Sequence, residues 1–224
     1  MVSPGETYAD IAAQPRPLAA LGLVLVVTSL ILGLFLSTDV GRNAALDQSL
    51  SIVDSFSVRL SDVQSRQVTQ LLEAHAGYAP LYAVAGILVG LPLAVAAVAG
   101  FAMLVLNAGL GGHATFKQLF AIVAYSRIIP LLQTALVTPL DYARESLSSA
   151  TSLLAVLPMV DDAGFLGRLL GWIDLFRVWW MVSLAIGLGV LYRRRSGPIA
   201  AAILALYALF ALAAAGLMTA FLGT

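Results

Sequence analysis

The sequence of 224 residues contains no cysteine and carries little charge. Without cysteine, the chain can form no disulfide bond, no catalytic thiolate and no metal site built on thiolate ligands. Charged residues make up 11% of the chain, whereas hydrophobic residues make up 60%. A soluble domain usually carries roughly a quarter charged residues, so these few charges cannot cover a soluble surface. The composition therefore indicates a membrane protein.

The sequence also lacks an excess of basic charge and the common catalytic motifs. Twelve Lys and Arg balance twelve Asp and Glu, so we expect no nucleic acid partner. There is no His-Glu-x-x-His, no Gly-x-Ser-x-Gly and no phosphate loop. The two histidines, His75 and His113, are predicted to lie on opposite sides of the membrane, where they cannot share a metal ion. We therefore expect no enzymatic activity, no catalytic residue, no metal and no cofactor.

What the sequence does contain is a set of long apolar stretches. Crossing a hydrocarbon core takes about 20 helical residues. Five stretches satisfy this length, and they predict an all-α integral membrane protein, a bundle of five transmembrane helices at 18–37, 80–107, 119–140, 171–192 and 198–222. Together they form a single membrane domain over 18–224. The third stretch is the least regular, because charged and helix-breaking residues interrupt it.

Residues 1–17 are predicted to form an interfacial segment at the cytoplasmic side. Ser3, Pro4 and Glu6 match a capping box with proline at the first helical position. A short amphipathic helix through Tyr8 and Ile11 follows from this start, and the prolines after it end the helix.

The positions of the basic residues predict the orientation. Segments 1–17, 108–118 and 193–197 carry as many Lys and Arg as the much longer segments 38–79 and 141–170. By the positive-inside rule, the denser segments face the cytoplasm. The N-terminus is therefore predicted inside and the C-terminus outside, in the inner membrane of a prokaryote.

Two segments predicted to lie outside, 43–76 and 141–157, are amphipathic. In both, apolar residues recur at helical spacing with serines and charges between them. These apolar faces can rest on the bilayer or on the outer end of the bundle, and this interpretation is favoured. The alternative is a docking face for a partner.

The chain resembles the Yip domain family of Ypt/Rab-interacting multi-pass membrane proteins, in particular its prokaryotic-type members. The resemblance rests on three motifs in the expected order, and it covers nearly the whole chain. They are SPGETYADIAAQPRPLAAL from Ser3, GLGGHATFKQLFAIVAYSRIIP from Gly109 and IDLFRVWWMVSLAIGLG from Ile173.

The resemblance implies a five-helix membrane domain with a cytoplasmic N-terminus. Eukaryotic members associate with Rab-type GTPases and act in vesicle traffic, so it also implies GTPase binding. The acidic Asp-Leu-Tyr-Gly-Pro signature of those members is absent from this sequence.

Three ionisable residues inside the predicted spans are candidate intramembrane site residues: Arg127, Asp174 and Arg177. Each costs roughly 2.5–3.5 kcal/mol at the centre of a span, so each needs a partner or a route to water. Arg177 lies one helical turn after Asp174 and can contact it. Arg127 is predicted to face protein and to meet a hydroxyl such as Ser183, a freed carbonyl or water, ahead of Asp174.

Two functions are consistent with these features. The favoured one is a non-enzymatic scaffold or adaptor in membrane organisation or trafficking, with the lipid bilayer and another membrane or membrane-associated protein as partners. The alternative is a subunit of a small-molecule or ion transporter with a polar site near Arg127, where Pro130 can open the helix.

Overall fold

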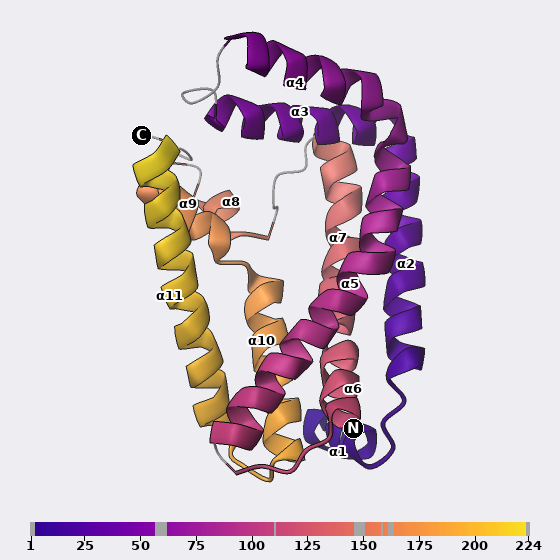
Figure 1. The fold of residues 1–224 in the computed structure, drawn as a ribbon, viewed down its shortest axis with the longest axis vertical. Coiled ribbons are helices and arrows are strands. Elements are labelled where there is room, and N and C mark those ends of the chain that lie inside the picture. The colour runs from indigo at the N-terminus through magenta and orange to yellow at the C-terminus, as the bar shows by residue number, and fades with distance from the viewer. Residues whose placement is uncertain are drawn as a thin grey trace. The chain divides into compact units, whose positions relative to one another are not determined.

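The computed structural model describes residues 3–56, 62–109, 111–145, 151–157, 159–160 and 164–222. Within these ranges the secondary structure consists of helices and one isolated bridge. The helices in Figure 1 are α1 (Pro4–Ala13), α2 (Pro17–Ser37), α3 (Asp39–Phe56), α4 (Asp62–His75), α5 (Ala79–Met103), α6 (Phe116–Ser126), α7 (Ile128–Arg144), α8 (Leu153–Val156), α9 (Phe165–Trp172), α10 (Leu175–Leu191) and α11 (Ser196–Leu222). A 3₁₀ turn, Ala76–Tyr78, precedes α5, and a π-helical turn, Leu104–Ala108, follows it.

Four stretches of helix in the described ranges are long and apolar enough to cross a membrane, by length and composition. They are Pro17–Ser37, Val63–Ala108, Phe116–Arg144 and Ser196–Ala220. The apolar helix α10 is shorter, with 17 residues, and at 1.5 Å per residue it is about 26 Å long. This is the lower end of the range for a transmembrane helix, about 17 residues. The predicted fold class, an all-α membrane protein, is confirmed, with four to five long apolar helices.

The third predicted span is divided at Arg127 into α6 and α7. Pro130 has no amide hydrogen, so it cannot donate to the carbonyl of Ser126, four residues earlier. At the junction the Arg127 amide donates to the carbonyl of Ala124 at 3.2 Å, a tighter turn than an α-helix makes. The proline thus explains why the helix breaks at this point.

The fourth predicted span, 171–192, also contains a break, because α9 ends at Trp172 and α10 begins at Leu175. Ile173 is extended, and its carbonyl accepts a hydrogen bond from the amide of Leu153 at 2.8 Å. The next residue, Asp174, forms an antiparallel bridge with Ser152. This pairing with residues 152–153 takes the backbone out of the helix, so the long helix starts four residues later than predicted.

The chain forms two compact units. Unit 1 contains Met1–Val27, Ile87–Gln133 and Leu175–Phe210, and unit 2 contains Thr28–Gly86, Thr134–Asp174 and Ala211–Thr224. Each of the five predicted spans contains one boundary between the units, so the chain passes between them once in every span.

Unit 1 has its core around α6. Leu119, Ile122 and Val123 are fully buried there, and they belong to a cluster with Val95 of α5 and Leu184 of α10. Helix α1 packs against α6 and α10 and lies beside them in Figure 1. The third predicted span, although the least regular in sequence, therefore supplies the best buried helix of this unit.

Unit 2 contains the helices that fall on the two predicted amphipathic segments. Segment 43–76 corresponds to α3 and α4, which pack against each other, while residues 57–61 lie outside the described part. In segment 141–157, the Ser152 hydroxyl accepts from the Ala155 amide at 3.3 Å and so caps α8, which packs on α9. Ser146 and Ser149, on the predicted polar face of that segment, lie outside the described residues.

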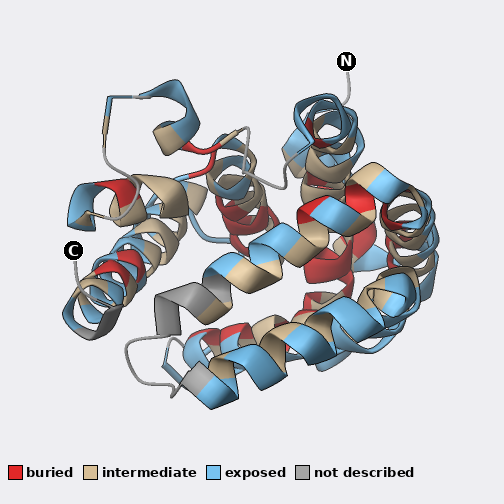
Figure 2. Ribbon diagram, turned by 90° about the horizontal axis from the view of Figure 1, so that it is seen from above, coloured by how far each residue is buried: buried red, intermediate tan, exposed pale blue. Residues whose placement is uncertain are grey.

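The long helices expose large apolar side chains over most of their length. Exposed residues, pale blue in Figure 2, run along most of the helical ribbon, and buried residues, in red, are confined to short stretches. Leu34 in α2, Leu93 in α5 and Leu209 in α11 are each more than 60% exposed. Such surfaces are stable only in a lipid environment, where their backbone groups are satisfied within each helix.

Candidate functional site

Helix α1 begins with the capping box that the sequence predicts. The Ser3 hydroxyl accepts from the Glu6 amide at 3.3 Å, and the Glu6 carboxylate accepts from the Ser3 amide at 3.0 Å. Pro4 occupies the first turn, and the helix ends at Ala13, two residues before Pro15. The hydrogen bond from the Ser3 amide stabilises the charged carboxylate and lowers the pKa of Glu6. The predicted start and end of this helix are confirmed.

The apolar face of α1 is buried in protein. Tyr8 is 6% exposed and Ile11 is 8% exposed, and both belong to the core of unit 1. The Tyr8 hydroxyl forms a 2.8 Å hydrogen bond with the Ser183 hydroxyl of α10, in which either oxygen can donate. Burial raises the pKa of Tyr8, so the phenol stays neutral and able to donate at physiological pH. The helix is thus docked on unit 1 through one aromatic side chain.

The docking depends on Gly187 in α10. A Cβ atom at this position would lie 2.6 Å from Cγ2 of Ile122 and 2.9 Å from the ring of Tyr8. Glycine therefore allows α6, α10 and the Tyr8 ring to approach closely, which is how small residues promote helix packing in membranes. A second contact comes from the start of α6, where the Gln118 side-chain amide donates to the carbonyl of Ala12 at 3.1 Å.

These contacts bring together the three motifs that carry the family resemblance. Tyr8 belongs to the first motif, Ile122 to the second, and Ser183 and Gly187 to the third. The second and third motifs meet again where the indole of Trp180 donates to the Ser126 hydroxyl at 2.9 Å. Motifs that lie far apart in sequence therefore form one packed arrangement in unit 1.

Arg127 lies at this junction of the motifs. Its guanidinium carbon is 4.8 Å from the centre of the Trp180 ring, which is close enough for a cation–π contact. Its Nε atom is buried and has no hydrogen-bond partner in the described part of the chain. We expected a hydroxyl, carbonyl or water contact, and the contact observed is with an aromatic ring. The Ser183 hydroxyl, one expected acceptor, is hydrogen-bonded to Tyr8.

The other two candidate residues flank the start of α10. In unit 2, Asp174 is 2% exposed, and its carboxylate accepts a hydrogen bond from the Thr151 hydroxyl. In unit 1, the guanidinium of Arg177 donates to the Tyr207 hydroxyl of α11 at 2.8 Å. Asp174 and Arg177 therefore each contact a neighbouring segment of their own unit.

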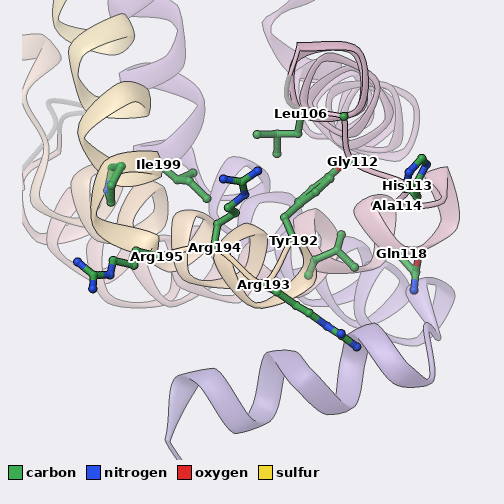
Figure 3. Close-up of a pocket in the computed structure, with 13 residues that line it drawn as sticks. Leu106, Gly112, His113, Ala114, Gln118, Tyr192, Arg193, Arg194, Arg195 and Ile199 are labelled. Atoms are coloured by element: carbon green, nitrogen blue, oxygen red, sulfur yellow. The ribbon is translucent and has the colours of Figure 1, made fainter.

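A basic pocket of about 840 Å³ lies in unit 1, between the loop that precedes α6 and the turn that joins α10 to α11. Figure 3 shows His113 from the loop and three consecutive arginines from the turn, Arg193, Arg194 and Arg195, whose side chains leave it in different directions. All four side chains are exposed. No carboxylate is among the described residues that line the pocket.

The wall of the pocket is held by a network centred on Asn107. Its side-chain oxygen accepts from the Tyr192 hydroxyl at 2.7 Å, and its side-chain nitrogen donates to the Ala114 carbonyl at 2.8 Å. A Cβ atom on Gly112 would lie 2.3 Å from the Tyr192 ring, so this position requires glycine. The loop and the turn are therefore fixed against each other.

The turn that carries the arginines has an unusual backbone. The Arg194 amide donates to the Gly189 carbonyl at 2.9 Å and the Arg193 amide to the Val190 carbonyl at 3.2 Å, which together make a Schellman motif. Arg193 stands at the left-handed position, with φ 51°, where glycine is usual. A non-glycine residue there costs about 1–3 kcal/mol, and such strain is typical of functional sites.

The sequence carried signals for parts of this arrangement. The capping box predicted α1, and the basic residues 193–195 stand out between two predicted spans. Neither pattern predicts that Tyr8 packs on α10 or that the arginine turn contacts the loop before α6. Among the described residues no group of three His, Cys, Asp or Glu is arranged to hold a metal ion. His75 contacts the Leu71 carbonyl through Nδ1 at 2.8 Å, and His113 lines the basic pocket.

The fold and its exposed apolar helices define a multi-pass α-helical membrane protein. A family model, described as the Yip1 domain, matches residues 1–218. The chain therefore belongs to the Yip1 domain family, a family of non-enzymatic membrane proteins. Searches among curated proteins and among solved structures each give no match.

Proposed function

We propose that the protein is a membrane scaffold or adaptor that holds a partner protein on the exposed face of α1. The observation that carries the proposal is the docking of α1, since burial of Tyr8 and Ile11 turns the opposite face of the helix outward. That face presents Glu6 and Asp10, which are exposed, and Thr7 is exposed at its edge. An exposed polar helix face held against α6 and α10 suits recognition more than catalysis.

A hollow beside α1 gives this face a place for a partner side chain. It has a volume of about 340 Å³ and is lined by residues of the second half of α1, by Arg16 and by Tyr125 of α6. Asp10 and Arg16 both line it, so it can accept a polar or charged side chain of either sign. A face one short helix long buries little area, which favours a transient complex over a permanent one.

Family membership suggests a small GTPase as one class of partner. Because the chain lacks the acidic Asp-Leu-Tyr-Gly-Pro signature, a partner of this class would need other contacts, and the α1 face offers them. We further propose that α1 lies on the cytoplasmic side of a prokaryotic inner membrane, because the densest basic segment, 193–197, belongs to the same unit.

The orientation can be tested with single cysteines in this cysteine-free chain. Cysteines at Gln67 and Gly197, both exposed, are expected to react with an impermeant maleimide from opposite sides of the membrane. Gly197 should react only after the cytoplasmic side is opened. Reaction of both from the same side would contradict the orientation.

The adaptor proposal can be tested by capturing partners from cells with a photo-crosslinker placed at Thr7. We expect a discrete protein adduct that is lost in two variants, Asp10→Arg, which changes the face, and Tyr8→Ala, which removes the docking side chain. The matched control is Gln67→Arg on α4, which should retain the adduct. An adduct that survives both α1 variants, or that consists of lipid alone, would overturn the proposal.

A further inference from the structure

A second cavity in unit 1 continues from the basic pocket and has the opposite chemistry. It is a groove of about 740 Å³ along α5, α10 and α11, and its lining is almost entirely apolar. Phe101, Leu184 and Ile203 are among the residues that line it. The groove and the basic pocket share three lining residues, Leu106, Pro198 and Ile199, so the two cavities adjoin.

The combined site is therefore charged at one end and apolar along the rest. Figure 3 shows the Arg194 side chain pointing toward Leu106, one of the residues that both cavities share. The basic end is rigid, because Tyr192, Asn107 and Gly112 hold the loop and the turn together. A ligand that fits must carry negative charge next to a long apolar part.

We propose that this site binds one anionic phospholipid from the surrounding bilayer, with its phosphate on the arginine turn and an acyl chain in the groove. Guanidinium groups pair with phosphate through paired hydrogen bonds, and basic pockets between transmembrane helices recognise anionic headgroups. A free anion would leave the groove unused, and a zwitterionic lipid would gain little from three arginines without a carboxylate beside them. Charge complementarity at one end and an apolar path at the other favour the anionic lipid.

The site is separate from the face proposed for a partner protein. The partner would contact the polar side of α1, whereas the lipid would contact the loop before α6, the arginine turn and the groove. Failure of one proposal therefore leaves the other standing, and the two experiments use different variants.

The test measures lipid retention by the purified protein in nanodiscs that contain equal amounts of phosphatidylglycerol and phosphatidylcholine. Native mass spectrometry after gentle release should show one phosphatidylglycerol retained in preference to phosphatidylcholine. In the triple variant Arg193→Gln, Arg194→Gln and Arg195→Gln, the preference should fall at least about tenfold, because each arginine contributes attraction to the anionic lipid. The matched control is Lys117→Gln, an exposed basic residue near the pocket that does not line it.

A variant that fills the groove distinguishes binding of a lipid from binding of a free anion. Ala202 lines the groove, so Ala202→Trp should fill it and reduce phosphatidylglycerol retention while the arginine turn is unchanged. Competition with inorganic phosphate should not displace the lipid. Each variant is first checked for a single monodisperse peak, and the single change Arg194→Gln replaces the triple variant if that one is unstable.

Four results would overturn the proposal. Equal retention of the two lipids would remove the charge selectivity, and an equal loss in Lys117→Gln would make the effect one of general surface charge. Retention unaffected by Ala202→Trp, or abolished by inorganic phosphate, would leave an anion site without a lipid.

Discussion

The two units of the protein bury different kinds of side chain. Apart from Ser126, the buried residues described in unit 1 are apolar or glycine, and they come from α1, α2, α5, the π-helical turn after α5, α6, α7 and α10. The buried residues described in unit 2 include Asp141, Ser152 and Asp174. In a membrane, apolar burial alone gives little preference for protein over lipid, so close fit and hydrogen bonds decide the packing. The core of unit 1 is thus closely fitted, with hydrogen bonds such as Tyr8 to Ser183 beside it, whereas unit 2 buries carboxylates.

The comparison predicts that matched substitutions in the two units lower the stability of the protein by different amounts. The largest loss of stability is expected for a substitution of Tyr8 in unit 1. Tyr8→Ala removes the ring that docks α1, and aromatic-to-alanine changes in a core cost about 3–5 kcal/mol. We expect a lower thermal midpoint in detergent and faster protease cleavage within the first sixteen residues. The matched change in unit 2 is Tyr82→Ala, at a side chain that is 58% exposed, and it should shift stability by less than about 0.5 kcal/mol. Equal shifts in the two variants would contradict the docking.

The second prediction concerns a buried hydrogen bond in unit 2. Asp174→Ala removes the acceptor for the Thr151 hydroxyl, and hydrogen bonds to charged groups contribute about 1.5–3 kcal/mol. We expect faster hydrogen exchange in residues 151–157, with exchange in α6 unchanged. Asp47→Ala, at an exposed carboxylate of the same unit, serves as the control. Exchange that rises equally in both units would mean that Asp174 supports the whole fold.

The third prediction concerns the close packing of side chains around Gly187 in unit 1. Gly187→Ala places a Cβ atom 2.6 Å from the Ile122 side chain, and overpacking a core costs about 1–3 kcal/mol. Gly100→Ala is the control, since no atom lies within 4 Å of its Cβ position and alanine favours the helix by up to about 1 kcal/mol. The thermal midpoints should therefore move in opposite directions. A neutral result at Gly187 would show that α1 and α10 separate without cost.

Features that depend on local sequence patterns could be predicted, whereas features that depend on contacts between distant residues could not. Apolar length and periodicity act locally, so the all-α membrane class, with several long apolar helices, and the capped start of α1 at Ser3 could be predicted. The break at Asp174 could not, because it depends on pairing with Ser152, twenty-two residues away. For the same reason the basic pocket could not be predicted, since the Arg193 turn meets the Gly112 loop through contacts of Tyr192 with Asn107 and Gly112, which lie far from it in sequence. The packing partner of Arg127 likewise depended on which face of α10 turns inward.

The smallest effect is expected for Arg127→Leu, because two opposing contributions of Arg127 nearly cancel. The contact of its guanidinium with the Trp180 ring stabilises by about 0.5–2 kcal/mol, whereas burying the charge with an unpartnered Nε atom opposes it. Arg127→Leu removes both and keeps the ring covered, so the free energy of unfolding, followed by thermal unfolding in detergent, should change by less than about 1 kcal/mol in either direction.

Arg127→Glu separates charge from packing at the same position. A carboxylate is repelled by the face of the Trp180 ring and would be buried without a partner, which costs about 3–5 kcal/mol. Tryptophan fluorescence should therefore change strongly in the Glu variant and little in the Leu variant. If Leu destabilises the protein as much as Glu does, the guanidinium makes a stabilising contact beyond the Trp180 ring.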